Sequence, residues 1–325
     1  MAKVETTYLG IPLKNPVIVS SSGLANNLEK VIKLSKAGAG AIVLKSIFEE
    51  QINLEAGNMI NGADYPEAHD YIQAYSKSNA LEQYLKLIED AKKNVDTPVF
   101  ASVNCVSASE WISFAKSVED AGADALELNI YYLPNTTKEE GNGVEETYYH
   151  ILREVRKRVS LPIAIKLGQQ FSNLPVFINK LKGYGANGVV LFNRFYAPDI
   201  NTENLTLSAA DVFSHPSEIR NSLRWVGIIS SLVSKLDICA STGVHDGLAV
   251  VKQLLAGAQA VQVCSALYKN GPDFLEQIIR VLGNWMEKHN FEAIEEFRGR
   301  LSYKNIPDPS VFERAQFMKY FSSMV

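Results

Sequence analysis

The chain has 325 residues, of which 46% are hydrophobic, and carries a formal net charge of -4. This is enough for one large α/β domain or two ordinary ones, with a sizeable core. The acidic balance excludes the basic footprint of a nucleic-acid-binding protein, and no apolar run approaches the roughly 20 residues that span a bilayer. The segment Met1–Thr7 lacks the apolar core of a signal peptide, so we expect a cytoplasmic enzyme.

Eight apolar runs along the chain predict eight strands, each followed by a helical pattern. We expect strands at Val17–Ser20, Ala41–Ile47, Val99–Asn104, Ala125–Ile130, Ile163–Leu167, Gly188–Asn193, Ile238–Ser241 and Ala260–Ser265. The clearest helical patterns are Leu81–Lys93, Ala108–Ala121, Glu145–Arg158, Leu174–Lys182, Leu223–Leu236, Asp246–Leu255 and Asp273–Lys288.

The junction between helix and strand repeats. Gly38, Gly122, Gly185 and Gly257 each end an amphipathic helix shortly before a buried-type strand. Repeated strand–helix units with eight parallel strands make an α/β fold of the TIM (β/α)8 type. A doubly wound sheet is the alternative, although it rarely needs eight such units.

The whole chain is therefore expected to form one domain, with the barrel over about residues 15–290. An N-terminal hairpin at Thr6–Lys14 is expected to plug the bottom of the barrel. A C-terminal extension over about residues 291–325 is expected to contain a helix at Val311–Phe321.

Three connections from strand to helix are long: Phe48–Asn79, Tyr131–Gly143 and Arg194–Arg220. Active sites of such barrels form from these connections at the carboxyl ends of the strands, and long loops in compact domains are usually functional. We therefore expect the site at this end of the barrel.

Small residues follow the last two strands. Ser241, Thr242 and Gly243 predict a tight turn, and Ser265 ends the last strand. Backbone N–H groups at such turns can approach a phosphate, although these residues can also serve only as turns.

Lys45 and Lys166 each continue an apolar strand, where a lysine needs a partner or solvent at its tip. A lysine that snorkels to the rim is one explanation. A desolvated lysine would instead form a Schiff base in an aldolase, whereas a charged one would stabilise an anionic cofactor or a substrate carboxylate. The amides of Asn104, Asn129 and Asn193 suit hydrogen bonds to a planar heterocycle. Together with the phosphate-type turns, they favour flavin mononucleotide (FMN) over a sugar phosphate.

No motif indicates a metal site. The three cysteines, Cys105, Cys239 and Cys264, have no metal-type spacing and are expected to be small buried hydrophobes.

Over roughly residues 5–301 the sequence resembles the dihydroorotate dehydrogenase family. The motifs that carry the resemblance are Asn15-Pro16 with the serines before Gly23, Val43-Leu44-Lys45-Ser46, Glu127-Leu128-Asn129, Ile165-Lys166-Leu167, Asn193, Ser241-Thr242-Gly243 and Gln262-Val263-Cys264-Ser265-Ala266-Leu267. The resemblance implies an FMN-containing TIM barrel, a homodimer, that oxidises dihydroorotate to orotate in pyrimidine synthesis.

The resemblance also implies roles for individual residues. Lys45 and Asn129 would lie between flavin and substrate, Lys166 beside the flavin ring, and Asn193 near the substrate. Backbone groups around Gly243 and Ser265 would hold the FMN phosphate. The implied cofactor-binding set is Ser21, Ser22, Lys45, Ser46, Asn104, Asn129, Lys166, Asn193, Ser241, Thr242, Gly243, Cys264 and Ser265, and the substrate-binding set is Lys45, Asn129 and Asn193.

The substrate half of the family pattern is eroded. Family members carry a cysteine or serine base in a loop like NLSCPN, whereas here the loop reads Asn129-Ile130-Tyr131-Tyr132-Leu133-Pro134-Asn135 and is one residue longer. Tyr131 and Tyr132 are the candidate replacements, although a phenol with a pKa of about 10 needs activation. The substrate-side pattern NSMGLPN of the family is absent, and Asn58-Met59-Ile60-Asn61-Gly62 resembles it only loosely. The glycine-rich turn expected before the seventh unit's helix is replaced by Ser214-His215-Pro216-Ser217.

The first interpretation is thus a dihydroorotate dehydrogenase-like FMN oxidoreductase, with Lys45 and one of the two tyrosines as catalytic residues. Three alternatives remain: a flavoenzyme of the same fold with another unsaturated or cyclic substrate, a catalytically degenerate FMN-binding protein, and a flavin-free lysine aldolase.

Overall fold

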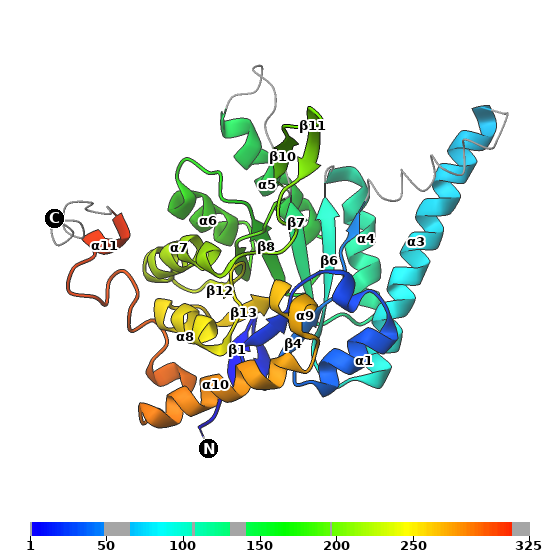
Figure 1. Cartoon of the computed structure of the whole chain (residues 1–325). Coiled ribbons are helices and arrows are strands. Elements are labelled where there is room, and N and C mark those ends of the chain that lie inside the picture. Colours follow the sequence, from blue (N-terminus) through cyan, green and yellow to red (C-terminus); the bar gives the residue numbers. More distant parts are fainter. Residues whose placement is uncertain (1, 49–65, 106–107, 131–140, 196, 314–325) are drawn as a thin grey trace.

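The computed structural model describes residues 2–48, 66–105, 108–130, 141–195 and 197–313 (Figure 1). Eight parallel strands form a ring in which each strand pairs with the next, and β13 pairs with β3. The strands are β3 (Val17–Val19), β4 (Ala41–Val43), β6 (Val99–Cys105), β7 (Ala125–Ile130), β8 (Ile163–Leu167), β9 (Gly188–Leu191), β12 (Asp237–Ala240) and β13 (Ala260–Val263). The predicted TIM barrel is confirmed with all eight strands, and the doubly wound alternative is wrong.

Helices surround the ring (Figure 1). They are α1 (Leu28–Lys36), α3 (Pro66–Asn94), α4 (Ala108–Asp120), α5 (Gly141–Arg156), α6 (Leu174–Gly183), α7 (Ile219–Leu232), α8 (Gly247–Ala256) and α10 (Phe274–Lys288). Every helix predicted from periodicity within the barrel is present, although α3 begins well before its apolar pattern does. None of the helices in the described part is both long and apolar enough to cross a membrane.

The barrel interior is filled at its amino-terminal end by the predicted hairpin, β1 (Thr6–Tyr8) and β2 (Ile11–Leu13). Three buried hairpin residues belong to this inner core, Tyr8, Leu9 and Leu13. They pack on inward-facing strand residues: Ile18, Ala41, Val43, Phe100, Ala125, Ala164, Val190, Cys239 and Ala260. The hairpin is therefore the plug that the sequence predicted. Cys239 is the small buried residue expected, and burial raises the pKa of its thiol.

Successive inward-facing residues of a barrel strand are two positions apart. The residues two positions beyond five of the inner-core residues are polar and buried or nearly so: Ser20, Ser102, Glu127, Lys166 and Gln262. The barrel interior therefore changes from apolar to polar toward the carboxyl ends of its strands.

Several elements lie outside the predicted pattern. The connection after β9 contains an exposed hairpin, β10 (Pro198–Asn201) and β11 (Thr206–Ala209), at the carboxyl end of the barrel (Figure 1). A short helix, α9 (Ser265–Asn270), follows β13, and a two-residue strand, β5 (Ile47–Phe48), pairs with β6. In the extension, the 3-10 turn η3 (Ile294–Glu296) precedes α11 (Ser310–Glu313). The rest of the helix predicted at Val311–Phe321 lies outside the described residues.

Candidate active site

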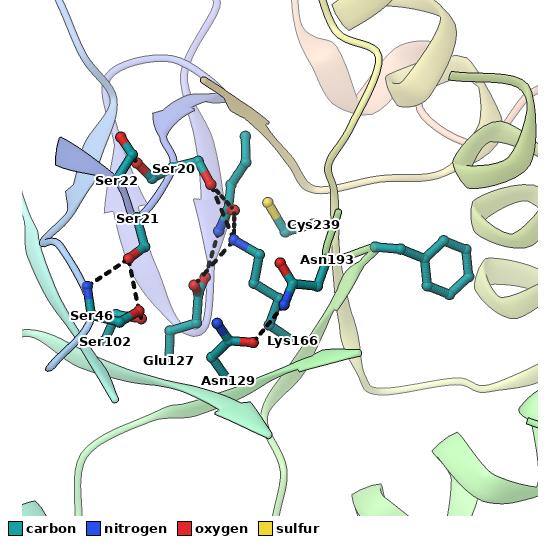
Figure 2. Close-up of polar contacts among 12 residues, drawn as sticks. Ser20, Ser21, Ser22, Ser46, Ser102, Glu127, Asn129, Lys166, Asn193 and Cys239 are labelled. Carbon is teal, nitrogen blue, oxygen red and sulfur yellow. Dashed lines mark hydrogen bonds and ion pairs between the residues drawn. The ribbon is translucent and has the colours of Figure 1, made fainter. Parts of the chain in front are cut away.

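A buried ion pair lies where the barrel interior becomes polar. The Lys166 ammonium is 3.4 Å from Glu127 Oε1 and donates to Ser20 Oγ at 3.1 Å and Gln262 Oε1 at 2.9 Å (Figure 2). Gln262 Nε2 donates to Glu127 Oε2 at 2.5 Å, and Ser20 Oγ donates to Gln262 Oε1 at 2.8 Å. The four side chains thus form one connected network that joins β3, β7, β8 and β13.

This network decides between the two chemistries expected of a strand-end lysine. An ammonium has three N–H donors, and Lys166 has three acceptors within reach. Glu127 is only 3% exposed, so its carboxylate requires this positive partner. A Schiff-base nucleophile needs a free neutral amine. Lys166 is therefore arranged as a fixed charge, and the geometry does not support the aldolase alternative.

A second group of hydroxyls lies beside the network, at the ends of β3, β4 and β6. Ser46 Oγ is 2.9 Å from Ser21 Oγ and 2.7 Å from Ser102 Oγ, and the Ser46 backbone N–H donates to Ser21 Oγ (Figure 2). Lys45 precedes Ser46 in the chain and is half-buried. Among the described residues its ammonium has no ion-pair partner, in contrast to Lys166.

The three predicted amides lie at or just beyond the carboxyl ends of β6, β7 and β9. Asn193 Nδ2 donates to Asn129 Oδ1 at 2.8 Å, which leaves the Asn129 Nδ2 group to donate elsewhere (Figure 2). Asn104 pairs with Asn129 in register across β6 and β7. The Asn104 Oδ1 atom is buried and finds no hydrogen-bond partner in the described part of the chain. A buried carbonyl oxygen of this kind needs a donor, which a ligand can supply.

A pocket with a cavity volume of about 180 Å3 connects the ion-pair network to the turns after β12 and β13. Of the predicted residues, the lining includes Ser21, Lys166, Asn193, Ser241, Thr242, Gly243, Cys264 and Ser265. The structure thus brings together most of the predicted cofactor-binding set. Asn129, Ser46 and Ser22 lie beside this pocket, because they form hydrogen bonds with Asn193, Ser21 and Cys264 of its lining.

Cys264 departs from the expectation of a plain buried hydrophobe. Its half-buried thiol lines the pocket and forms a hydrogen bond with Ser22. Burial raises the pKa of this thiol above its usual value. The side chain of Cys105 lies outside the described residues.

The turn after β12 has an unusual backbone. Thr242 and Gly243 have φ values of 74° and 77°, in the region that favours glycine. The Thr242 hydroxyl donates to the Phe192 carbonyl at 3.0 Å, which ties the turn to the end of β9. A Cβ atom built on Gly243 would clash with the Ile219 backbone nitrogen. Gly243 is therefore required by close chain packing.

Substitution of Gly243 by alanine is expected to lower the free energy of unfolding by about 2–3 kcal/mol, since the added carbon meets backbone and φ is positive. Urea unfolding followed by circular dichroism measures this. Gly183→Ala is the matched control, because a Cβ there meets nothing within 4 Å. Equal stability of the two variants would contradict the packing argument.

Several residues of the site were not predicted. Glu127 and Gln262 stood in family-like motifs without a role, and Arg194 was not singled out. Arg194 lines the pocket, with its Nε 3.0 Å from Glu218 Oε2 and its Nη2 donating to the Asp211 carbonyl at 2.8 Å. It therefore holds the connection that returns from the exposed hairpin against the pocket.

Ser214 follows in that connection and contacts both Ser265 and His245. The alternation of strand residues offered a signal for Glu127 and Gln262. Ser214 stood in the sequence only as part of the motif that replaces a glycine-rich turn, and no local sequence signal pointed to His245. Within the described residues, no three His, Cys, Asp or Glu side chains gather as metal ligands.

Two parts of the predicted substrate side lie outside the described residues. These are the candidate bases Tyr131 and Tyr132, and the loose motif echo Asn58–Gly62.

Comparison with known proteins identifies similar chains. A family model described as dihydroorotate dehydrogenase matches residues 3–286. The catalytic subunit of dihydroorotate dehydrogenase B (NAD(+)) from Thermoplasma volcanium is 28% identical over 309 residues, covering 92% of this chain and 98% of the relative. Dihydroorotate dehydrogenase A (fumarate) from Lactococcus lactis is 24% identical over 330 residues, covering 92% and 99%.

Proposed function

Because the chain belongs to the dihydroorotate dehydrogenase family, we propose that it is an FMN-dependent oxidoreductase that converts dihydroorotate to orotate in pyrimidine biosynthesis. Family membership itself makes the chain an oxidoreductase. The observation that carries the finer proposal is one pocket with a fixed lysine charge at one end and hydroxyl-bearing turns at the other.

The residues present fit FMN. A flavin ring offers both an N–H donor and carbonyl acceptors, and Asn104 Oδ1, which has no partner among the described residues, needs a donor. The Asn129 Nδ2 group can donate to a ring acceptor, and the Lys166 ammonium can place its positive charge beside the ring. At the other end, Ser265 and the turn at Gly243 suit a phosphate, since barrel phosphate sites form from the loops after the last two strands.

In this proposal the protein's own residues orient the bound ring and the substrate and supply a fixed positive charge. Glu127 and Gln262 hold Lys166 in place, so its charge is preorganised. Asn193 orients Asn129 by donating a hydrogen bond from its Nδ2 group to the Asn129 amide oxygen, at 2.8 Å. Lys45 would orient the substrate and the ring, and a phenol of Tyr131 or Tyr132 would take the substrate proton. When bound, FMN would supply the hydride acceptor.

The test of the function is an anaerobic titration with dihydroorotate. Bleaching of the flavin absorbance by dihydroorotate is expected. A flavin that is bound but is not reduced by this compound would favour another cyclic substrate, which is the second candidate because the sequence motif for the substrate loop is eroded.

The cofactor released from the purified protein is expected to be FMN and not FAD. The chain has a single phosphate-type end to its pocket and no GxGxxG dinucleotide fingerprint. Mass spectrometry of the denatured supernatant identifies it. FAD, or no flavin after reconstitution, would contradict the proposal.

Turnover of dihydroorotate is expected to be slow near pH 7 and to increase with pH, because a tyrosine base must lose a proton with a pKa of about 10. The double change Tyr131→Phe with Tyr132→Phe should remove this increase in stopped-flow flavin reduction. Rapid oxidation that is independent of pH would show that another residue supplies the base.

We further propose a homodimer in the cytoplasm, as the resemblance implies. Ile200, Leu205 and Leu207 expose 65–85% of their surfaces on the β10–β11 hairpin, where a second copy could cover them. Analytical ultracentrifugation at micromolar concentration tests this state.

A further inference from the structure

Three side chains form a hydrogen-bonded row at the proposed phosphate end of the pocket. His245 Nε2 is 2.9 Å from Ser214 Oγ, and Ser214 Oγ donates to Ser265 Oγ at 3.1 Å. The Ser214 backbone N–H also donates to Ser265 Oγ, at 3.0 Å. Ser214 and Ser265 both line the pocket. We call His245, Ser214 and Ser265 the hydroxyl row.

The donors of this row have only one consistent arrangement. A hydroxyl has one proton and two lone pairs. The Ser214 proton goes to Ser265, so His245 Nε2 must carry a proton and donate to Ser214. Ser265 Oγ accepts two hydrogen bonds, which occupy its lone pairs and leave its own proton to donate. The row therefore runs from the imidazole to a hydroxyl donor at the pocket, and suits an acceptor anion there.

The charge of His245 can change near neutral pH. Burial, nearby Lys269 on α9 and nearby His215 lower its pKa, while Asp246 at the start of α8 and the hydrogen bond with Ser214 act in the opposite direction. The net direction is downward, so the pocket without an anion favours the neutral ring. An anion at Ser265 would favour the charged ring.

We propose that His245 is a positioning residue that couples phosphate binding to uptake of one proton. A phosphate monoester that accepts from Ser265 is stabilised through Ser214 by a positively charged His245. This inference rests on the proposed FMN function for the identity of the monoester, and concerns how the site holds its phosphate. Ser214 contacts His245 and Ser265, which lie 31 and 51 positions away in the chain.

The first experiment measures the dissociation constant of FMN for the apoprotein by flavin fluorescence from pH 5.5 to 8.5. The ratio of the FMN affinity of the wild type to that of His245→Gln should increase about tenfold toward low pH. A rise of about one unit in the pKa of His245 on binding would give this factor. Because both proteins bind the same ligand, comparing them at each pH removes the effect of the phosphate's own ionisation, whose second pKa is about 6. Riboflavin, which lacks the phosphate, should show no such difference.

Two further variants complete this design. Ser214→Ala should remove the pH dependence while His245 remains, because the row is interrupted. His150→Gln, at an exposed position on α5, is the matched histidine control and should behave as the wild type. Unchanged pH dependence in His245→Gln or in Ser214→Ala would overturn the proposal. Riboflavin affinity and thermal melting show whether each variant is folded.

The second experiment separates failure of this inference from failure of the proposed function. Proton NMR of the histidine Hε1 signals, assigned with His245→Gln, follows the pKa of His245 with and without inorganic phosphate. A rise in this pKa with phosphate is expected. If the pKa of His245 rises with phosphate but FMN does not bind, the proposed function is wrong and the coupling of His245 to a phosphate stands. If FMN binds and the pKa of His245 does not change with phosphate, the role proposed for His245 is wrong and the proposed function stands.

Discussion

Replacing Glu127 by alanine is expected to lower the free energy of unfolding by about 3–5 kcal/mol, because the change leaves the Lys166 ammonium buried without its counter-charge. Both side chains are almost fully buried, at 3% and 6% exposure. Gln262 also loses the acceptor of its 2.5 Å hydrogen bond. Urea unfolding of the flavin-free protein measures the effect without the stabilisation that a bound ligand adds.

Two controls show whether the buried charge is the cause. Glu295→Ala removes a surface ion pair with Arg298 and should cost no more than about 1 kcal/mol. Adding Lys166→Met to Glu127→Ala removes the unpaired charge and should recover most of the lost stability. No recovery in the double variant would mean that the cost comes from packing and not from the charge.

Replacing Lys45 by alanine is expected to slow substrate-driven flavin reduction by about 10²–10³-fold while the barrel stays folded. Lys45 lies just beyond β4, half-buried, and no described residue neutralises its charge. Its ammonium is therefore available to a developing negative charge in the site. Anaerobic stopped-flow absorbance measures the rate, with dihydroorotate as the reductant.

The exposed Lys36→Ala, at the end of α1, is the matched control and should reduce its flavin at the wild-type rate. Circular dichroism separates a folded variant from a misfolded one. Reduction of the Lys45 variant at the wild-type rate would remove Lys45 from the proposed mechanism, and loss of the fold would favour a structural role.

The barrel was predictable because its strands are short, apolar and regularly spaced. Hydrophobic periodicity and the recurring glycine junctions depend on local sequence alone. The exposed β10–β11 hairpin carries little of this signal, since no buried face imposes an alternating pattern on it. It was therefore anticipated only as a long connection.

The site was predictable in part for the same reason. Strand ends could be located, so residues such as Lys166 and Asn193 could be placed at the pocket. The alternation of strand residues places Glu127 on the same face as Ala125, but which face points inward follows only from the closed ring, so Glu127 was not assigned a role. The contact of Ser214 with Ser265 spans 51 positions and arises only from the folded chain.

The plug at the base of the barrel links the beginning of the chain to its end. The Leu9 backbone N–H donates to Asp237, and the Thr6 hydroxyl donates to the Gln259 carbonyl, across 228 and 253 positions. The ring itself closes only through pairing of β3 with β13. On the ribosome, the hairpin therefore emerges long before its partners do. A nascent chain that stops short of β13 leaves two strand edges unpaired, and such edges are prone to join other chains.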